Sequence, residues 1–476
     1  MKMDATNYRH RLHIAWQNVQ ANRRLRPADF INGFRMVQPL RTLPGGSVPF
    51  DMTQLAVEMF TRLNIHYEPL TTPMRQRIKY PLACSAQPGQ PRVGLFLDAP
   101  DHVSGVSLTI GEWQEQARRR GCHLVVHTCA PVAMPIADVV TFPPMGTVRL
   151  DAYSGLTVHI PRMDELLRYI DAMDIDVIHV STPGPVGLLG LLAAQRKNIP
   201  VCGTYHTDFP RYAGELTGDA ELEQVGWRFM QWFYGQMHRV AAPTESIRRE
   251  LMEHGFDPAR IEVVGRGVDT EQFHPGRRDA ALRQQWGQRQ SIKLLYAGRL
   301  SREKNLETLA QAFRMLCRTR PDVSLVLAGD GPYRAELQRT LADLPVFFTG
   351  LLSGEKLWRA FASCDLFVFP SKTDTFGRVV LEAQAAGLPV VVSASGGPKD
   401  AMRDGETGVV VPDINASRLA SAVDILTDDP ACMARYAAAA RAYACTQSRE
   451  ASFEAFWRLH QNIFPAARNH EHEVML

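Results

Sequence analysis

The chain has 476 residues, of which 45% are hydrophobic and 22% are charged, a composition that excludes a mainly disordered protein. Its length predicts two domains plus an appendage. The longest apolar stretch has nine residues (186–194), far fewer than the ~20 that span a bilayer, and the first 30 residues lack the pattern of a signal peptide. The eight cysteines are scattered without a CxxC pair, which favours free thiols in the cytoplasm over disulfides or a zinc site.

Charge divides the chain at about residue 90. Residues 1–90 hold 12 basic against 5 acidic side chains, whereas the remainder holds 41 against 45. A basic extension on a slightly acidic body indicates an anionic partner surface. No DNA- or RNA-binding motif is present, so we expect no nucleic acid and consider an anionic membrane instead. Basic and apolar residues interleave over residues 1–41, and 8–21 can form an amphipathic helix, as an interfacial segment requires; a merely accessory extension stays open.

From residue 91, short apolar runs alternate with amphipathic segments, which is typical of an open α/β sheet. We expect strands at 92–98, 122–129, 176–181, 200–206 and 238–244, with helices at 105–120 and 185–197. After a turn-rich linker at 273–278 the series restarts, with strands expected at 293–298, 323–331, 346–350, 365–370, 389–393 and 408–412. The expected domains are therefore 91–275 and 276–445, followed by a helix or tail at 446–476 that can cross back to the first domain. Ligands of such sheets bind at the carboxyl ends of the strands.

The first motif with chemical content is AGRLSREKN (297–305), at the exit of an expected strand. Arg299 and Lys304 lie beside the start of a helix, where a guanidinium and an ammonium can hold a diphosphate. Taken alone, the pattern also fits solvated surface residues.

The second motif is PSKTDTFGRVVLEAQAAGLPVVVS (370–393). It places Asp374 in a loop before a helix that begins near Gly377, with Glu382 in the second turn. The peptide N–H groups from Phe376 through Gly377, Arg378 and Val379 to Val380 point out of the helix N-terminus and can bind hydroxyls or phosphate. Glu382 can accept two hydroxyl hydrogen bonds, as a ribose offers. The alternative makes Asp374 a loop cap and Glu382 a surface residue.

Together with LAGDGPYRAEL (327–337), these motifs closely resemble the donor-binding domain of the retaining glycosyltransferases of family 4, over most of 291–430. The resemblance implies the GT-B fold, an α/β architecture of two facing Rossmann-like domains with a central cleft. It also implies that Arg299 and Lys304 hold the diphosphate of a nucleotide sugar, that Glu382 binds its ribose, and that the 375–380 backbone binds sugar hydroxyls and phosphate. Asp374 stands at the first acidic position of the family motif, where glutamate is usual.

The N-terminal half resembles the same family, in its branch of mannosyl and lipid-glycosyl transferases. LDAPDHVSGVSLTI (97–110) is similar to the first strand and glycine loop, so that Gly105 would lie near the diphosphate. His206, at a strand exit in YHTDF, occupies the position of the family's active-site histidine, which touches the donor sugar. Asp208 and Arg266 also fall at cleft positions.

The sequence therefore predicts a retaining hexosyltransferase that moves a sugar from a UDP- or GDP-sugar to an acceptor hydroxyl of a glycolipid or a polysaccharide precursor. His206, Arg299, Lys304 and Asp374 are the expected catalytic residues. No metal-ligand cluster is apparent, so we expect a metal-independent reaction in which the nucleotide sugar is a co-substrate and no cofactor is needed. The expected location is the cytoplasm, peripherally on the inner membrane. Two alternatives are a nucleotide-sugar-binding pseudoenzyme or scaffold, and an epimerase or phosphorylase of the same fold.

Overall fold

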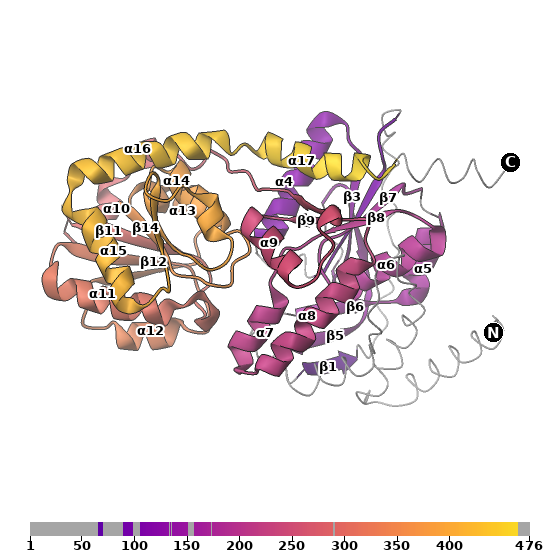
Figure 1. Cartoon of the computed structure of the whole chain (residues 1–476), viewed down its shortest axis with the longest axis horizontal. Coiled ribbons are helices and arrows are strands. Elements are labelled where there is room, and N and C mark those ends of the chain that lie inside the picture. The colour runs from indigo at the N-terminus through magenta and orange to yellow at the C-terminus, as the bar shows by residue number, and fades with distance from the viewer. Residues whose placement is uncertain are drawn as a thin grey trace.

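The computed structural model describes residues 65–69, 89–98, 105–132, 134, 136–150, 157–172, 174–288 and 291–464. Figure 1 shows two α/β domains side by side along the long axis, with the helices α16 and α17 running across both. The predicted helix at 8–21 and the basic segment 1–41 lie outside the described residues.

The N-terminal domain is built on a seven-stranded parallel sheet of order β10-β9-β8-β7-β2-β3-β4. Its central strands are buried on both faces, which explains why their sequences are mostly apolar without a regular polar alternation. The strands are β2 (Val93–Leu97), β3 (Leu124–Cys129), β4 (Val139–Phe142), β7 (Val177–Val180), β8 (Val201–Thr204), β9 (Arg239–Ala242) and β10 (Ile261–Val263). The helices are α4 (Gly105–Arg120), α5 (Met163–Ala172), α6 (Pro185–Lys197), α7 (Phe209–Thr217), α8 (Ala220–Gly235), α9 (Glu245–Glu253) and the short 3₁₀ helix η2 (Pro258–Arg260).

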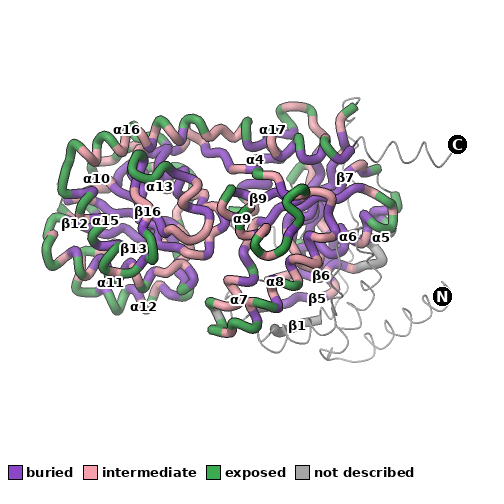
Figure 2. Tube along the Cα trace, viewed as in Figure 1, coloured by how far each residue is buried: buried purple, intermediate pink, exposed green. Residues whose placement is uncertain are grey.

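The C-terminal domain repeats this plan with a six-stranded parallel sheet of order β13-β12-β11-β14-β15-β16. Figure 2 shows the buried interior of both sheets between more exposed helices. The strands are β11 (Ile292–Ala297), β12 (Val323–Ala328), β13 (Val346–Gly350), β14 (Leu366–Phe369), β15 (Val390–Ser393) and β16 (Gly408–Val411). The helices are α10 (Ala280–Gln285), α11 (Leu306–Thr319), α12 (Arg334–Thr340), α13 (Gly354–Ala362), α14 (Arg378–Ala385), α15 (Ala416–Asp428) and α16 (Pro430–Thr446), with the 3₁₀ helices η3 (Pro275–Arg277), η4 (Arg302–Lys304) and η5 (Pro398–Ala401).

The last described helix, α17 (Arg449–Gln461), follows the C-terminal domain in sequence but packs on the N-terminal one. Phe453, Phe456 and Trp457 are buried in a core that they share with strands β2, β3 and β7 and with α4. The ring of Phe456 stacks on that of Trp113 with centroids 3.9 Å apart. The helix therefore completes the hydrophobic core of the first domain.

A small antiparallel sheet of order β1-β5-β6 was not predicted. Its strands are β1 (Ile65–Pro69), β5 (Pro144–Leu150) and β6 (Thr157–Pro161). β1 falls inside the predicted extension 1–90, so this part of the extension is paired with the N-terminal domain. The prediction missed these strands because they interrupt the βα alternation on which it relied.

The predicted fold class, two tandem α/β domains with parallel sheets, is confirmed. Of the helices that the structure describes, none has both the length and the apolar character required to cross a bilayer.

Candidate active site

Lys304 and Asp374 form an ion pair at the carboxyl ends of the strands of the C-terminal domain. Lys304 lies in η4 after β11, and its Nζ donates to both carboxylate oxygens of Asp374, at 3.0 and 2.9 Å. Nζ also donates to the hydroxyl of Tyr212 on α7, in the other domain, at 3.0 Å. Burial acts to lower the pKa of Lys304, but the Asp374 charge and Tyr212 raise it well above its ordinary value. The site therefore holds a fixed ammonium at the domain boundary.

Arg299 follows Gly298 at the exit of β11, and its side chain is half-buried. Its carbonyl accepts a hydrogen bond from the Tyr296 hydroxyl at 2.9 Å, which fixes the loop. The neighbouring loop packs so closely that a Cβ on Gly329, where φ is +152°, would lie 1.9 Å from the Gly298 carbonyl oxygen. Only glycine fits there, and this contact holds the β11 and β12 exits together.

Helix α14 is preceded by its N-cap residue Gly377, whose φ of +74° is in the left-handed region that favours glycine. A Cβ there would also lie 2.9 Å from Cγ of Pro398. The first-turn N–H groups of Arg378 and Val379 follow, with Phe376 half-buried before them. The expectation that the N–H of Val380 belongs to this cradle was wrong, because it donates to the Gly377 carbonyl at 2.8 Å.

Glu382, the expected ribose ligand, is already hydrogen-bonded within the protein. Its Oε1 accepts from Nε of Arg378 at 2.9 Å, and Arg378 in turn binds both carboxylate oxygens of Glu112 on α4, at 2.7 and 2.5 Å. All three side chains are largely buried, with exposures of 13% for Arg378, 18% for Glu112 and 8% for Glu382. Burial raises the pKa of Glu382, whereas Arg378 lowers it and the Glu112 charge raises it further. An ion network thus joins the expected ribose ligand to the other domain.

His206 follows β8 and lies against Arg266, which follows β10. Nη2 of Arg266 lies 3.2 Å from Nδ1 of His206, while Nε2 of His206 is buried and has no hydrogen-bond partner among the described residues. The main-chain oxygen of His206 accepts from Oγ1 of Thr375 at 2.5 Å, which ties it to the loop of Asp374. Burial, and then the Arg266 charge, lower the pKa of His206 well below its ordinary value. Its imidazole is therefore neutral.

Two further predicted residues, Gly105 and Asp208, each lie at the start of a helix. Gly105 is the first residue of α4, and a Cβ added there would meet nothing within 4 Å, so its role as a close-approach glycine has no support from its described surroundings. The loop before it, 99–104, lies outside the described residues. Asp208 is buried as the cap of α7, where it accepts from the N–H of Arg211.

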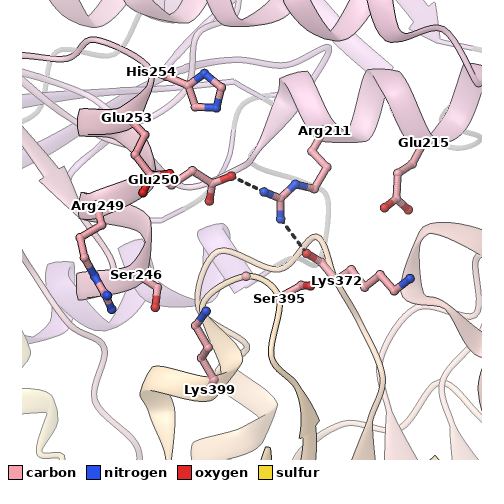
Figure 3. A pocket seen from close by; sticks show the side chains of 11 residues that line it. Arg211, Glu215, Ser246, Arg249, Glu250, Glu253, His254, Lys372, Ser395 and Lys399 are labelled. Atoms are coloured by element: carbon pink, nitrogen blue, oxygen red, sulfur yellow. Dashed lines mark hydrogen bonds and ion pairs between the residues drawn. The ribbon is translucent and has the colours of Figure 1, made fainter. Parts of the chain in front are cut away.

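Between the domains lies a polar pocket of about 560 Å³, which Figure 3 shows. Arg211 enters it from α7, where it pairs with Glu250 of α9 and donates to the carbonyl of Lys372 at 3.0 Å. Ser246 and Asp400 form a second link between the domains, at 2.6 and 2.8 Å. The lining residues are Arg211, Glu215, Ser246, Arg249, Glu250, Glu253, His254, Lys372, Ser395, Gly396 and Lys399.

The described residues contain one group whose atoms are close enough to hold a metal ion, namely His179, Cys202 and His460. All three side chains are buried, and hydrogen bonds explain why the two histidines lie together. His460 Nδ1 lies 2.8 Å from the Phe456 carbonyl, so its Nε2 accepts from His179 Nδ1 at 3.0 Å, and His179 Nε2 in turn accepts from Thr204 at 3.0 Å. This neutral chain fastens α17 to β7 and β8.

Sequence reasoning missed Glu112, Tyr212, Trp113 and Thr375, which join the predicted residues to one another. A signal exists for Glu112: it is a carboxylate beside the buried stripe of α4 that includes Thr109, Ile110 and Trp113. The others have no local signal, because their contacts are made by residues far apart in the chain.

Two family models match the chain in the order of its domains. The first, described as "Glycosyltransferase Family 4", covers residues 103–272, and the second, "Glycosyl transferases group 1", covers residues 279–443. A GDP-mannose-dependent alpha-mannosyltransferase of Mycolicibacterium smegmatis is 32% identical over 315 residues, which are 65% of this chain and 81% of that protein. The chain belongs to the family 4 glycosyltransferases.

Further relatives of this family 4 glycosyltransferase are more distant or matched over less of their length. A protein of the same description from Corynebacterium glutamicum is 33% identical over 285 residues, 60% of this chain and 66% of that protein. The match thus spans just under two thirds of that relative. An alpha-monoglucosyldiacylglycerol synthase of Streptococcus pneumoniae is 27% identical, with 64% and 71% of the two chains covered.

The fold of this glycosyltransferase also matches solved structures. Sucrose-phosphate synthase of Thermosynechococcus elongatus superposes with a TM-score of 0.61 at 22% identity, covering 79% of this chain and 100% of that one. The predicted GT-B architecture is confirmed by this likeness.

Proposed function

We propose that the protein is a retaining hexosyltransferase that moves a hexose from a nucleoside diphosphate sugar to an acceptor hydroxyl. The observation that carries this proposal is the meeting of Lys304, Asp374 and the N-terminus of α14 at the cleft, opposite His206 and Tyr212 of the other domain. Departure of a diphosphate requires positive charge and N–H donors where negative charge develops, and these groups supply both.

Each residue has a proposed role. Arg299 and Lys304 bind the diphosphate, and the N–H groups of residues 376–379 bind phosphate or sugar hydroxyls at the helix N-terminus. Asp374 and His206 contact the transferred sugar. Glu382 binds the ribose through Oε2, because Oε1 is already bound to Arg378.

We assign none of the described side chains as a covalent nucleophile. We propose that the acceptor hydroxyl attacks the anomeric carbon from the face that the diphosphate leaves. The bond between that carbon and the phosphate oxygen breaks, the new glycosidic bond forms on the same face, and a diphosphate oxygen takes the acceptor proton. Charge separates in this step, so the fixed ammonium of Lys304 lowers the barrier. We propose that no metal ion is required.

The relatives support a choice of donor and acceptor to test. Two of them are described as GDP-mannose-dependent, so GDP-mannose is the first donor to test, with UDP-sugars next. The relative described as an alpha-monoglucosyldiacylglycerol synthase supports a glycolipid acceptor. The pocket beside Arg211 is proposed to hold the acceptor's polar head, because its mixture of carboxylates and guanidinium groups suits hydroxyls and its lining joins both domains.

Incubation with labelled GDP-mannose, UDP-glucose and UDP-galactose, with and without membrane lipids, tests the proposal. Label in the lipid fraction from one donor is the expected result. Binding of the donor without transfer would indicate a scaffold, and an isomerised nucleotide sugar would indicate an epimerase.

We further propose peripheral attachment to the cytoplasmic face of an anionic membrane through the basic residues 1–41. Each basic residue near an anionic leaflet contributes about 1 kcal/mol, and salt screens it. Deletion of residues 1–41 should reduce sedimentation with vesicles containing phosphatidylglycerol while donor binding stays unchanged. Equal sedimentation of both proteins would contradict this attachment.

A further inference from the structure

Arg266 is a buried cation with a fixed geometry. Its side chain is only 6% exposed, although it lies in the loop that follows β10 at the cleft. Nη1 donates to the carbonyl of Val264 at 2.9 Å, and Nη2 lies 3.2 Å from Nδ1 of His206. A guanidinium can only donate, so Nδ1 of His206 is the acceptor in this pair.

That direction decides where the imidazole carries its proton. A neutral histidine has one N–H, and if Nδ1 accepts, the proton is on Nε2. Nε2 is buried without a hydrogen-bond partner among the described residues. A buried N–H without an acceptor is unfavourable and calls for an explanation, which a bound ligand offering a hydroxyl oxygen supplies.

The guanidinium is held from behind by aromatic rings. Its central carbon lies 5.0 Å from the ring centroid of Trp113, and that indole stacks on Phe456 of α17 with centroids 3.9 Å apart. Ser452 of α17 donates to the carbonyl of Gly265, next to Arg266, at 2.8 Å. The loop, the cation and the tryptophan are thus braced by the helix that crosses from the other domain.

We propose that Arg266 is a positioning residue, which holds His206 as the neutral Nε2–H tautomer so that this N–H donates to a hydroxyl of the transferred sugar. The inference rests on the proposed function, and it assigns to Arg266 an action through His206 and no contact with the diphosphate.

The charges around the pair support this assignment. Arg266 and the buried His179 face His206, and Glu112 and Arg378 face Arg266. Burial lowers the pKa of Arg266 to about 9, with Arg378 lowering it and Glu112 raising it, so the guanidinium is still charged at neutral pH. Because that charge is one cause of the low pKa of His206, its removal should raise this pKa.

The first test reads the tautomer without any turnover. In ¹⁵N-labelled protein, the nitrogen shifts of His206, assigned by comparison with His206→Ala, should show Nε2–H in the wild type. Arg266→Met preserves the bulk of the side chain but removes the donor, so the Nδ1–H form should appear. Nδ1–H as the main form in the wild type would overturn the proposal.

The second test is a double-mutant cycle on transfer. Arg266→Met should lower kcat by roughly 10²-fold, the cost of a misplaced catalytic group, and should leave the Kd of the nucleoside diphosphate unchanged. In the His206→Ala background the same substitution should change kcat by no more than about twofold, because the two residues act as a unit. If the effects of the two substitutions on kcat add fully, or if Arg266→Met weakens binding of the nucleoside diphosphate, Arg266 acts on the substrate directly. Either result would contradict the proposal.

The third readout is the pH profile of kcat. Arg266→Met should move the acid limb to higher pH, because a raised pKa lets His206 protonate on Nδ1 as pH falls. Arg266→Lys keeps a charge near His206, so its profile should stay close to that of the wild type; an identical profile for Arg266→Met would count against the proposal. Arg239→Met is the matched control. That arginine pairs with Glu262 on the same sheet, so its substitution should leave the pH profile of kcat unchanged.

Absence of transfer by the wild type would refute the proposed function, while the tautomer measurement would still test this inference.

Discussion

Glu112 and Arg378 form a two-point ion pair between the domains, with nitrogen–oxygen distances of 2.7 and 2.5 Å. Arg378 also binds Glu382, the residue assigned to the ribose, at 2.9 Å. A movement of the domains that separates Glu112 from Arg378 therefore changes the charge next to Glu382. Donor binding and the relative position of the domains are linked through one guanidinium.

This link predicts a pH effect. Burial raises the pKa of Glu382 and Arg378 lowers it, so Arg378→Met should raise this pKa further. The carboxylate then takes up a proton more readily as pH falls, so the affinity for the nucleoside diphosphate should decrease more steeply on acidification than it does in the wild type. Titration calorimetry checks this, with Arg378→Lys as the conservative control. Parallel pH curves would contradict the link.

Glu382 itself should be needed for donor affinity. Glu382→Ala removes a charged acceptor and should weaken donor binding by about 1–3 kcal/mol, and Glu382→Gln, which keeps one acceptor, should weaken it less. Glu307, which lies on an exposed position of α11, provides the control: Glu307→Ala should bind as the wild type does. An unchanged Kd in Glu382→Ala would refute the ribose assignment.

Lys304 should affect both transfer and stability. Lys304→Ala removes a preorganised charge, which we expect to lower kcat roughly 10²-fold. It also leaves Asp374, only 23% exposed, without its ammonium partner, at a cost of about 1–3 kcal/mol in the free energy of unfolding. Arg302→Ala is the matched control, since that arginine is 66% exposed and pairs with Glu336 of its own domain. Steady-state kinetics measures kcat, and urea unfolding measures the free energy of unfolding. Wild-type values of both in Lys304→Ala would contradict the assignment of Lys304 to the site.

Asp98 predicts a dependence of stability on pH. Burial raises its pKa from 3.8 to about 6, while the Thr182 hydroxyl and the N–H groups of Val186 and Gly187 oppose this. Between these values the folded state binds more protons than the unfolded state, so the contribution of this group to stability falls as pH rises from about 4 to about 6. The side chain of Asp98→Asn cannot titrate. As pH rises through that window, the free energy of unfolding of this variant should therefore increase relative to that of the wild type. Urea unfolding at several pH values measures this, and Asp413→Asn, at a 90% exposed side chain, should follow the wild type.

Phe456 should be essential to the first domain although it lies near the end of the chain. It is fully buried against Trp113, and Phe456→Ala should cost about 3–5 kcal/mol in the free energy of unfolding. Ile425→Ala, at a side chain that is 73% exposed, should change it by less than about 0.5 kcal/mol. Similar unfolding curves for the two variants would contradict the proposed packing of α17.

The sequence was most informative where local pattern decides structure. Apolar runs such as β14 and β15 identify strands buried on both faces. The order of the motifs along the chain placed Arg299, Lys304 and Asp374 at the carboxyl ends of the strands of one sheet. It was least informative where contacts join distant segments. Nothing near Lys304 indicates Tyr212, and nothing near Glu382 indicates Glu112. The small sheet was missed because β1 and β5 lie far apart in the chain and pair antiparallel outside the βα series.

The return of α17 to the first domain has a consequence for synthesis. Phe453, Phe456 and Trp457 belong to the core around β2 and α4, but the ribosome makes them after the whole second domain. The first domain therefore leaves the ribosome with an open apolar groove where α17 will lie, and it stays incomplete until some 180 further residues have followed β10, which ends at Val263. Nascent chains commonly fold one domain at a time, from the N-terminus onward. Here that order cannot hold, and chains stalled before residue 449 should be the ones that chaperones retain.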